Sequence, residues 1–469
     1  MITSSKILAI SKYFFLFILS IFIIYIYINI LQFKLMNPDG GYYLWLVNKI
    51  SEGKITGIDI KTGYLPLSLY LLSFVRVLTD SPTYFHYLYI LLIIQLLNAL
   101  LLNFIAKHYT TDKFIPALAS LMYLLMSFHS DGSLFMLEPF VNLFGLLSLL
   151  FYLSFRNYNS YYMLVPGILG ALSFFCKQYG LVYSLAVPFL LLVDNKNVSS
   201  AFKRIFLYAV GYAIPFIAFI LYYRIEGCGL REIITIYSGN GYGQRTTGAY
   251  FSGLYTLIKI YGIFLPFSLW VLIKKGIKNH ILIYLYLIFG FSLQFFFYKF
   301  PHYYILLIPY LILSAVIIYE SLKERHKLLF TFFSLLIFTF IINIYASILT
   351  LRNFSGSNGI FKENIAEQTK NSIQIRNYVG KNDKVLLFNY DLVNYYFLCN
   401  LNPPLEKKYG IIYFGIVSPD RYLENINQTD FVLIWDKSLT EFYNELKSID
   451  IKWVEIKISS HLLLLKKDI

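Results

Sequence analysis

The sequence predicts a polytopic α-helical membrane protein with about 11 transmembrane helices and a small C-terminal α/β domain. Three observations lead to this fold class. Hydrophobic residues make up 58% of the 469-residue chain and charged residues only 14%, whereas ordinary soluble domains carry about 25% charged residues. Apolar runs near the ~20 residues that cross a ~30 Å hydrocarbon core recur as far as residue 350. From residue 352 onward, shorter apolar segments alternate with polar ones.

The apolar runs define the expected membrane spans. Lys6 and Lys12 precede the first run, which is longer than the apolar core of a cleaved signal peptide. We therefore expect this run to stay in the membrane as a signal anchor. The predicted spans are 13–36, 84–106, 115–129, 138–155, 161–176, 180–193, 205–223, 254–273, 280–298, 303–319 and 328–350.

The distribution of Lys and Arg predicts the orientation, because short cytoplasmic loops retain positive charge. With the N-terminus in the cytoplasm, the inner loops hold most basic residues of the membrane region. An odd number of spans then places everything after residue 351 outside the plasma (inner) membrane. The net charge of +14 is therefore a sign of topology and does not indicate nucleic-acid binding. The basic residues assigned to the inner side are Lys6, Lys12, Lys107, Lys113, Arg156, Lys196, Lys203, Arg204, Lys274, Lys275, Lys278, Lys323, Arg325 and Lys327.

The first outer loop, residues 37–83, is neither a crossing nor an ordinary loop. Residues 42–52 place apolar side chains on one side and polar ones on the other, a helical pattern that stops at Gly53. We expect this helix to lie along the membrane surface with its aromatic side chains at headgroup depth. Residues 64–78 are apolar but too short to span, so we interpret them as interfacial or re-entrant.

The composition divides the chain into a membrane domain, residues 1–351, and an extracytoplasmic α/β domain, residues 352–469. Within the membrane domain, the outer loop 226–253 is rich in Gly, Ser and Thr, which predicts a mobile segment. The α/β domain shows no catalytic spacing, so no chemistry is assigned to it. Its expected elements are a helix over 362–379, strands in KVLLFNY and DFVLIWD, helices in SPDRYLENI and SLTEFYNEL, and strands in IKWVEIKI and HLLLLKK.

Asp39 is the first candidate for chemistry, since an ionisable group at the end of a membrane helix is costly to keep. The structural alternative is that Asp39 only caps the helix that follows it. Gly40 and Gly41 favour the functional interpretation, because glycines let a backbone turn sharply and approach a ligand.

Asp131 and Glu138 form a second acidic candidate, in the predicted short outer connection HSDGSLFMLEPF. No Lys or Arg lies beside either residue in the sequence. Glu138 precedes Pro139 at the start of a predicted helix, so a favourable interaction with the helix dipole is the structural alternative. Both acids fall on the same predicted side as Asp39. The functional interpretation is therefore an acidic pocket that they share with Asp39.

Three basic groups fall at the outer ends of predicted spans or in an outer loop: Lys177 in FFCKQYG, His302 in KFPHYYILL and Arg245 in the loop 226–253. A phosphate at headgroup depth favours charge-assisted contacts with such groups. The structural alternative is that they are snorkelling anchors. The sequence has no Walker A loop, no HExxH, no GxSxG and no His/Cys cluster, which removes support for ATP-driven pumping, zinc proteolysis and serine acyl transfer.

These segments, taken in order, resemble the polytopic GT-C glycosyltransferases that use a polyprenyl-phosphate sugar. That group contains protein O-mannosyltransferases, lipid A aminoarabinose transferases and the Rgt-type bacterial enzymes. The resemblance covers the whole chain and rests on PDGGYYLWLVNKISEG, LEPFVNLFGLL, KQYG and PHYYILLIPYL. In the first of these, Asp39 occupies the place of the family's first-loop aspartate.

The resemblance implies transfer of a sugar from a polyprenyl-phosphate donor to a hydroxyl of a lipid, glycan or protein, by a single inverting displacement at the outer face. Asp39 would be the general base, and Glu138 or Asp131 would position the acceptor or assist. The phosphate would be held by Lys177 and His302, with Arg245 as a weaker candidate. The substrate-binding set implied is Tyr42, Tyr43, Lys177, Gln178, Arg245, His302 and Tyr303.

This chain also departs from the family pattern. Many members carry Asp-Glu where this chain has Asp39 and Gly40, and the missing acid argues against a metal at this motif. No cofactor is predicted, and a divalent cation stays an open alternative. Many have Lys-Pro-Pro after the surface helix, where this chain reads KTGYLP. A flippase or transporter for polyprenyl-linked glycans, and a polysaccharide polymerase or ligase, are the alternative functions. A flippase is expected to carry polar groups through the bilayer midplane, but here the charged candidate residues cluster at the outer edge.

Overall fold

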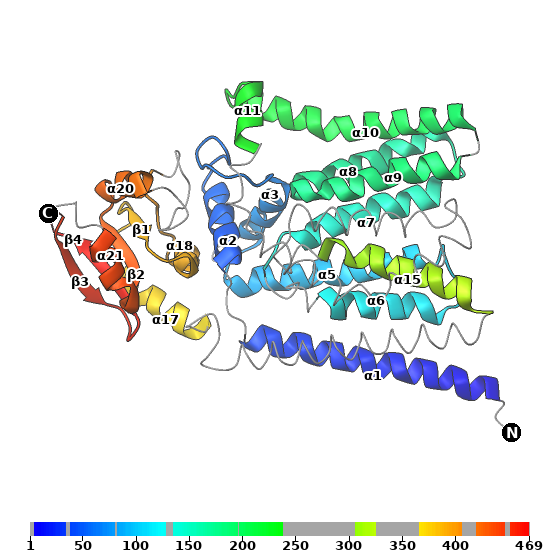
Figure 1. Ribbon diagram of the computed structural model, residues 1–469, viewed down its shortest axis with the longest axis horizontal. Helices are drawn as coiled ribbons and strands as arrows, with labels where there is room; N and C mark the ends of the chain where they lie inside the picture. Colours follow the sequence, from blue (N-terminus) through cyan, green and yellow to red (C-terminus); the bar gives the residue numbers. More distant parts are fainter. Residues whose placement is uncertain are drawn as a thin grey trace. The chain divides into compact units, whose positions relative to one another are not determined.

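In a computed structural model, the chain folds into two compact units (Figure 1). The first comprises Met1–Gln32, Leu88–Tyr223 and Gln244–Arg352, and the second comprises Phe33–Tyr87, Arg224–Gly243 and Asn353–Ile469. The structure describes residues 4–33, 38–79, 82–127, 135–195, 197–237, 305–324, 365–405, 419–445 and 451–468.

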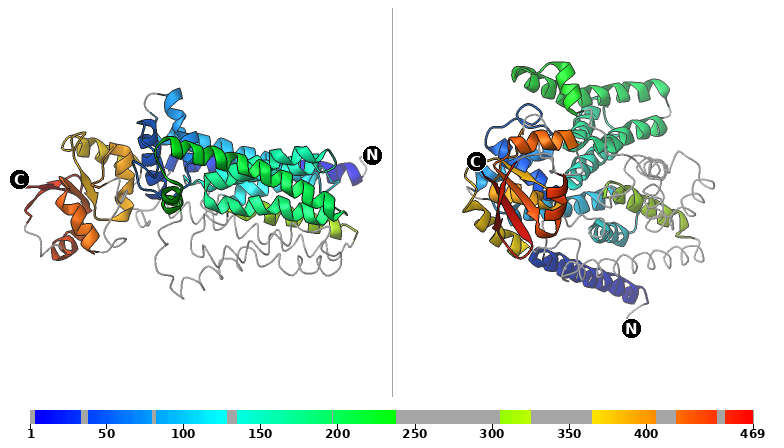
Figure 2. Two further views of the ribbon diagram at one scale, coloured as in Figure 1. Left: turned by 90° about the horizontal axis from the view of Figure 1, so that it is seen from above. Right: turned by 60° about the vertical axis from the view of Figure 1, so that its left-hand side comes forward.

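Long apolar helices make up the first unit. In Figures 1 and 2, α5 to α10 and α15 run side by side with their axes roughly aligned. Short 3₁₀ turns, η2 (Ser160–Met163) and η3 (Gln178–Gly180), precede α8 and α9. Among the described residues, its helices are α1 (Ser4–Phe33), α5 (Tyr84–Ala106), α6 (Phe114–Ser127), α7 (Glu138–Phe155), α8 (Leu164–Cys176), α9 (Leu181–Asp194), α10 (Val198–Ile225) and α15 (Ile308–Leu322).

Three helices of the described residues, α5, α7 and α10, are long and apolar enough to cross a membrane. The bounds of α5 and α7 coincide with the predicted spans 84–106 and 138–155. Helix α10 begins seven residues before the predicted span 205–223 and ends two residues after it. Three predicted spans, 254–273, 280–298 and 328–350, lie outside the described residues.

Polar contacts gather at one end of the first unit, where α7 and α9 end and α10 begins. Arg156 pairs with Asp194 at 3.6 Å, and the Tyr152 hydroxyl donates to the same carboxylate at 2.6 Å. The guanidinium of Arg204 donates to the backbone carbonyl of Arg156. At the turn between α5 and α6, the Thr110 hydroxyl donates to Glu320 on α15 at 2.9 Å. These contacts tie the helix ends together.

Helices α8 and α10 approach each other through a pair of glycines. A Cβ atom on Gly167 would lie 2.2 Å from the Tyr208 carbonyl oxygen, and one on Gly211 would lie 2.2 Å from the Leu164 carbonyl oxygen. Small residues let helix backbones pack closely in a membrane, where close packing replaces the hydrophobic effect.

We predict that Gly211→Ala destabilises the protein by about 1–3 kcal/mol, because the new methyl group meets backbone atoms that cannot rotate away. The intrinsic helix propensity of Ala acts in the opposite direction by about 0.5–1 kcal/mol, so a net loss reports the steric contact. Thermal unfolding in detergent measures the change. Gly63→Ala is the matched control, since a Cβ there meets nothing within 4 Å. Equal stability of the two variants would contradict the close approach.

The second unit contains a four-stranded sheet in the order β1-β2-β4-β3. Strand β1 pairs parallel with β2, and β4 pairs antiparallel with both β2 and β3. All five residues of β2 are buried, which explains its continuous apolar sequence. The strands are β1 (Val385–Leu387), β2 (Phe431–Trp435), β3 (Trp453–Lys457) and β4 (Leu462–Lys467).

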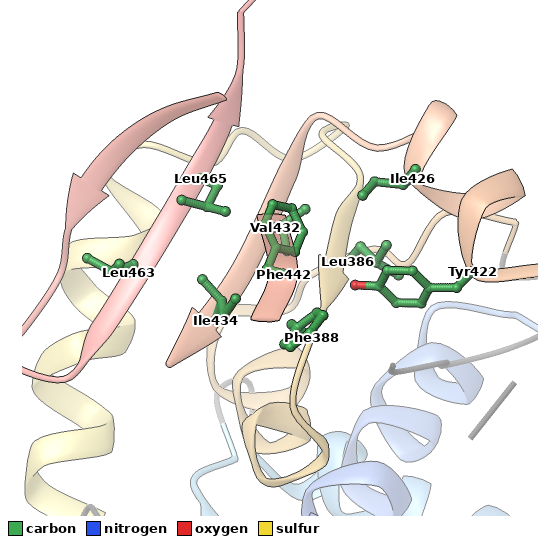
Figure 3. Close-up of a cluster of buried hydrophobic side chains, with 9 residues drawn as sticks. All are labelled: Leu386, Phe388, Tyr422, Ile426, Val432, Ile434, Phe442, Leu463 and Leu465. Carbon is green, nitrogen blue, oxygen red and sulfur yellow. The ribbon is translucent and has the colours of Figure 1, made fainter. Parts of the chain in front are cut away.

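One face of this sheet packs against two helices, α20 (Pro419–Asn427) and α21 (Leu439–Glu445). Figure 3 shows alternate side chains of β1, β2 and β4 pointing into the core, as the two-residue period of a strand requires. Tyr422 and Ile426 of α20 and Phe442 of α21 complete the core. Its members are Leu386, Phe388, Tyr422, Ile426, Val432, Ile434, Phe442, Leu463 and Leu465.

The second unit also contains α2, from the segment 37–83 that the sequence predicts to be an outer loop, packed against α18. The sequence pattern predicts a surface helix with one polar side, but α2 buries part of that side, with Asn48 7% and Lys49 4% exposed, whereas Ser51 and Glu52 are exposed. The reason is that residues 394–402 cover this part. The remaining helices of the unit are α2 (Pro38–Ser51), α3 (Leu67–Ser73), α4 (Val75–Leu78), α11 (Leu230–Tyr237), α17 (Ile365–Arg376), η6 (Tyr390–Val393), α18 (Asn394–Cys399) and η7 (Asp436–Ser438).

Candidate active site

Asp39 lies in the first turn of α2, directly after Pro38. Proline suits the first helical position because its missing N–H has no partner there, and an acid in the first turn interacts favourably with the helix dipole. The hydroxyl of Tyr390 donates a hydrogen bond to Oδ1 of Asp39. The two residues are 351 positions apart in the sequence.

Hydrogen bonds on both sides of Tyr390 fix the turn that carries it. The Asn389 side chain accepts from the backbone N–H of Trp435 at 3.2 Å and donates to the Ser438 hydroxyl at 3.2 Å. The Asp391 carboxylate accepts from the indole N–H of Trp435 at 2.9 Å. The Tyr390 backbone is therefore anchored to the end of β2.

Aromatic side chains surround the start of α2. Tyr42 stacks on Trp45 with ring centroids 6.1 Å apart, and Tyr43 meets the edge of Tyr64 at 5.1 Å. Tyr43 is buried. Burial raises the pKa of Tyr42 to about 12, although a hydrogen bond with Thr62 acts in the opposite direction. Tyr42 therefore keeps its proton at neutral pH.

The C-terminal half of α2 is held by the segment after α18. The indole N–H of Trp45 donates to the Leu401 carbonyl oxygen at 3.1 Å, and the Lys49 ammonium group donates to the Asn402 side chain at 2.8 Å. The Asn400 amide donates to Glu52 at 3.0 Å. Burial acts to raise the pKa of Glu52, but the contacts with Asn400 and Lys49 outweigh it and lower that pKa. These contacts fix the orientation of α2 about its own axis.

In the first unit, Glu138 and Lys177 form a buried ion pair. The Lys177 ammonium nitrogen lies 2.6 Å from Oε1 of Glu138, and the two side chains are 1% and 0% exposed. The same nitrogen lies 5.5 Å from the centre of the Tyr179 ring. Breaking such a pair is costly, because one charge is then left in a low-dielectric interior.

Local backbone geometry brings these two charges together. Glu138 begins α7, next to Pro139. Helix α8 ends at Cys176, and Lys177 follows it with an extended backbone before the η3 turn that leads into α9. The side chain of Gln178, the next residue, is half-buried.

A layer of neutral polar groups holds the start of α7 to other helices. Asn98 donates to the Pro139 carbonyl oxygen at 2.9 Å, and Ser173 donates to that of Val141 at 2.8 Å. Asn142 donates to the Ile305 carbonyl oxygen at 3.0 Å and accepts from the Tyr183 hydroxyl at 2.8 Å. Polar side chains that bond across helices in this way hold a membrane bundle together and restrain the backbone that carries Glu138.

The structure therefore brings together two groups of predicted site residues. Asp39, Tyr42 and Tyr43 share α2 in the second unit, and Glu138, Lys177 and Gln178 lie near one another in the first. Four predicted site residues lie outside the described residues: Asp131, Arg245, His302 and Tyr303. Among the residues that are described, no group of three or more His, Cys, Asp and Glu side chains forms a metal-binding cluster.

Sequence reasoning missed Tyr390 and the polar layer around Asn142. Asn98 and Asn142 carry a signal, since an amide inside an apolar span needs a partner. Tyr390 carries none, because a tyrosine near the end of a strand is ordinary and its contact with Asp39 is long-range.

No protein-family model matches the sequence, and no curated protein sequence matches it. Among solved structures, the chain is similar to ArnT from Cupriavidus metallidurans in the apo state, with 12% identity, a TM-score of 0.64 and coverage of 97% of this chain and 98% of that chain. The same protein bound to undecaprenyl phosphate matches with 12% identity, a TM-score of 0.64 and coverage of 96% and 97%. An Archaeoglobus fulgidus oligosaccharyltransferase tethered with an acceptor peptide matches with 11% identity, a TM-score of 0.49 and coverage of 90% and 70%. The chain thus has the ArnT fold over nearly its whole length, in agreement with the fold that the sequence resemblance predicts.

Proposed function

We propose that this chain is a membrane glycosyltransferase that moves a sugar from a polyprenyl-phosphate donor to an acceptor hydroxyl group. The ArnT fold, which extends over 97% of the chain, is the observation that carries the proposal. ArnT binds undecaprenyl phosphate in one of its two structures. The carboxylate of Asp39, held at the first turn of α2, supports the proposal because such a transfer requires a base.

In the proposed reaction, the acceptor oxygen attacks the anomeric carbon of the sugar. The bond from that carbon to the phosphate oxygen breaks, and polyprenyl phosphate leaves with the bonding electrons. Asp39 receives the proton of the acceptor hydroxyl. The displacement is a single inverting step that passes through an oxocarbenium-like state, as in other glycosyl chemistry.

The departing phosphate is assigned to Lys177, His302 and Arg245, and the acceptor to Glu138 or Asp131. Within the described residues, the ion pair relates two of these roles, because Glu138 fixes the position of the Lys177 ammonium group. A phosphate near this pair brings further negative charge, which a cation attracts strongly in a low-dielectric site. The remaining substrate contacts are assigned to Tyr42, Tyr43, Gln178 and Tyr303.

We place the reaction at the outer face of the membrane, in a protein of about 11 spans with an extracytoplasmic α/β domain. Charge within the first unit supports this orientation. Arg156 and Arg204 meet at the end of the bundle opposite to the start of α7. At the turn after α5, burial and the nearby charge of Arg156 lower the pKa of His108. Under the positive-inside rule this basic end is cytoplasmic.

The function can be tested with purified full-length protein in lipid nanodiscs. The protein is incubated with undecaprenyl phosphate carrying radiolabelled glucose, mannose or aminoarabinose, together with a lipid and glycan extract as acceptor. Release of undecaprenyl phosphate together with a labelled product supports transfer. Movement of an intact labelled donor across proteoliposomes without cleavage of any donor would replace this proposal with a flippase.

A further inference from the structure

The geometry points to Tyr390 as a positioning residue for Asp39, so that the C-terminal region takes part in the reaction through the first outer loop. This inference rests on the proposed function and deepens it. Its direct basis is the hydrogen bond from the Tyr390 hydroxyl to Oδ1 of Asp39, within the second unit.

Tyr390, which donates this hydrogen bond, is held in place by the sheet. Strand β1 is anchored by Leu386 and by Phe388, which lies in the core shared with Phe442 at a ring distance of 5.5 Å (Figure 3). Tyr390 follows two residues later, between Asn389 and Asp391. Both neighbours are bonded to Trp435 at the end of β2. The backbone of Tyr390 is therefore fixed before and after the residue.

Asp39, which accepts this hydrogen bond, is also held in place, by the packing of α2 against α18. A Cβ atom on Gly41 would lie 2.3 Å from the Asn394 side-chain oxygen, so α2 touches the start of α18 two residues after Asp39. At the other end, Lys49 and Glu52 bond the segment that follows α18. With contacts at both ends, α2 cannot turn about its axis, and Asp39 stays opposite Tyr390.

This arrangement gives the two carboxylate oxygens of Asp39 different roles. Oδ1 accepts the hydrogen bond from the Tyr390 hydroxyl, which fixes the plane of the carboxylate. Oδ2 then receives the proton of the acceptor hydroxyl. A base whose orientation is preset needs no reorganisation when the acceptor arrives, which favours the chemical step more than binding. The expected signature of Tyr390 is therefore in kcat.

The test is Tyr390→Phe, assayed for release of undecaprenyl phosphate with the donor that the wild-type protein uses. We expect kcat to fall about tenfold or more, as for loss of a hydrogen bond to a charged group, with KM for the donor unchanged. Tyr443→Phe is the matched control, since the Tyr443 hydroxyl donates to the Glu455 carboxylate at 3.2 Å in the same unit. A parallel rise of KM, or an unchanged kcat in Tyr390→Phe, would overturn the inference.

A second readout needs no turnover. Carbodiimide labelling of Asp39, followed by peptide mass spectrometry at one fixed pH, should be faster in Tyr390→Phe than in wild type and unchanged in Tyr443→Phe. Equal labelling in all three proteins contradicts the contact, whether or not the protein transfers sugars. Conversely, wild-type protein that releases no undecaprenyl phosphate from any donor, but shows faster labelling of the variant, contradicts the proposed function and leaves the contact intact.

Discussion

Asp39→Asn is expected to lower sugar transfer by about 10²- to 10⁴-fold, the usual contribution of a general base. The amide has nearly the same shape as the carboxylate but cannot take a proton from the acceptor hydroxyl. Its side-chain oxygen can still accept the hydrogen bond from Tyr390, and Asn is tolerated at the start of a helix. We therefore expect normal expression and folding, with the loss confined to turnover.

Release of undecaprenyl phosphate by the variant and by wild type measures this effect. Asp59→Asn is the matched control, since it removes the same charge from the same segment, residues 37–83. The Asp59 carboxylate accepts a hydrogen bond from the backbone N–H of Ile55 at 2.8 Å. That control should keep its activity. Turnover of Asp39→Asn at the rate of the control would remove Asp39 from the base role. Combining Asp39→Asn with Tyr390→Phe should add no further loss, because Tyr390 acts through Asp39.

The parts of this fold that sequence could predict are those set by local patterns. The bounds of α5 and α7 follow from apolar runs between polar turns, because a membrane helix must be long and continuously apolar. The same reasoning holds for KVLLFNY and DFVLIWD, which form β1 and β2. A strand covered on both faces has no polar alternation and reads as one apolar run.

The parts that sequence could not predict depend on contacts between distant segments. Lys49 has the pattern of a solvated residue on the polar side of a helix, yet it is buried against Asn402. Glu138 and Lys177 were expected as separate contacts for acceptor and phosphate, and the structure joins them in one ion pair. Charge and spacing identify such residues as candidates, but only the packing of α7 against α8 reveals that they are partners.

The ion pair itself leads to the other large effect that we expect. Lys177→Met should destabilise the protein by about 3–5 kcal/mol, because it leaves the Glu138 carboxylate buried without its cation. Glu138→Gln/Lys177→Met removes both charges and should return the stability to within about 1 kcal/mol of wild type, since a neutral pair of similar volume often replaces a buried ion pair without loss. Thermal unfolding in nanodiscs measures both values.

The double variant also separates a structural role of Lys177 from a role at the phosphate. If Lys177 neutralises the departing phosphate, the double variant is stable but still transfers sugar slowly, because its cation is absent. Lys323→Met is the control for the charge itself, since Lys323 pairs with Glu320 at an exposed helix end and its loss should leave the unfolding temperature nearly unchanged. A double variant with wild-type stability and wild-type turnover would show that the pair serves packing alone. A single Lys177→Met variant as stable as Lys323→Met would instead show that the Glu138 carboxylate is not held in a low-dielectric interior.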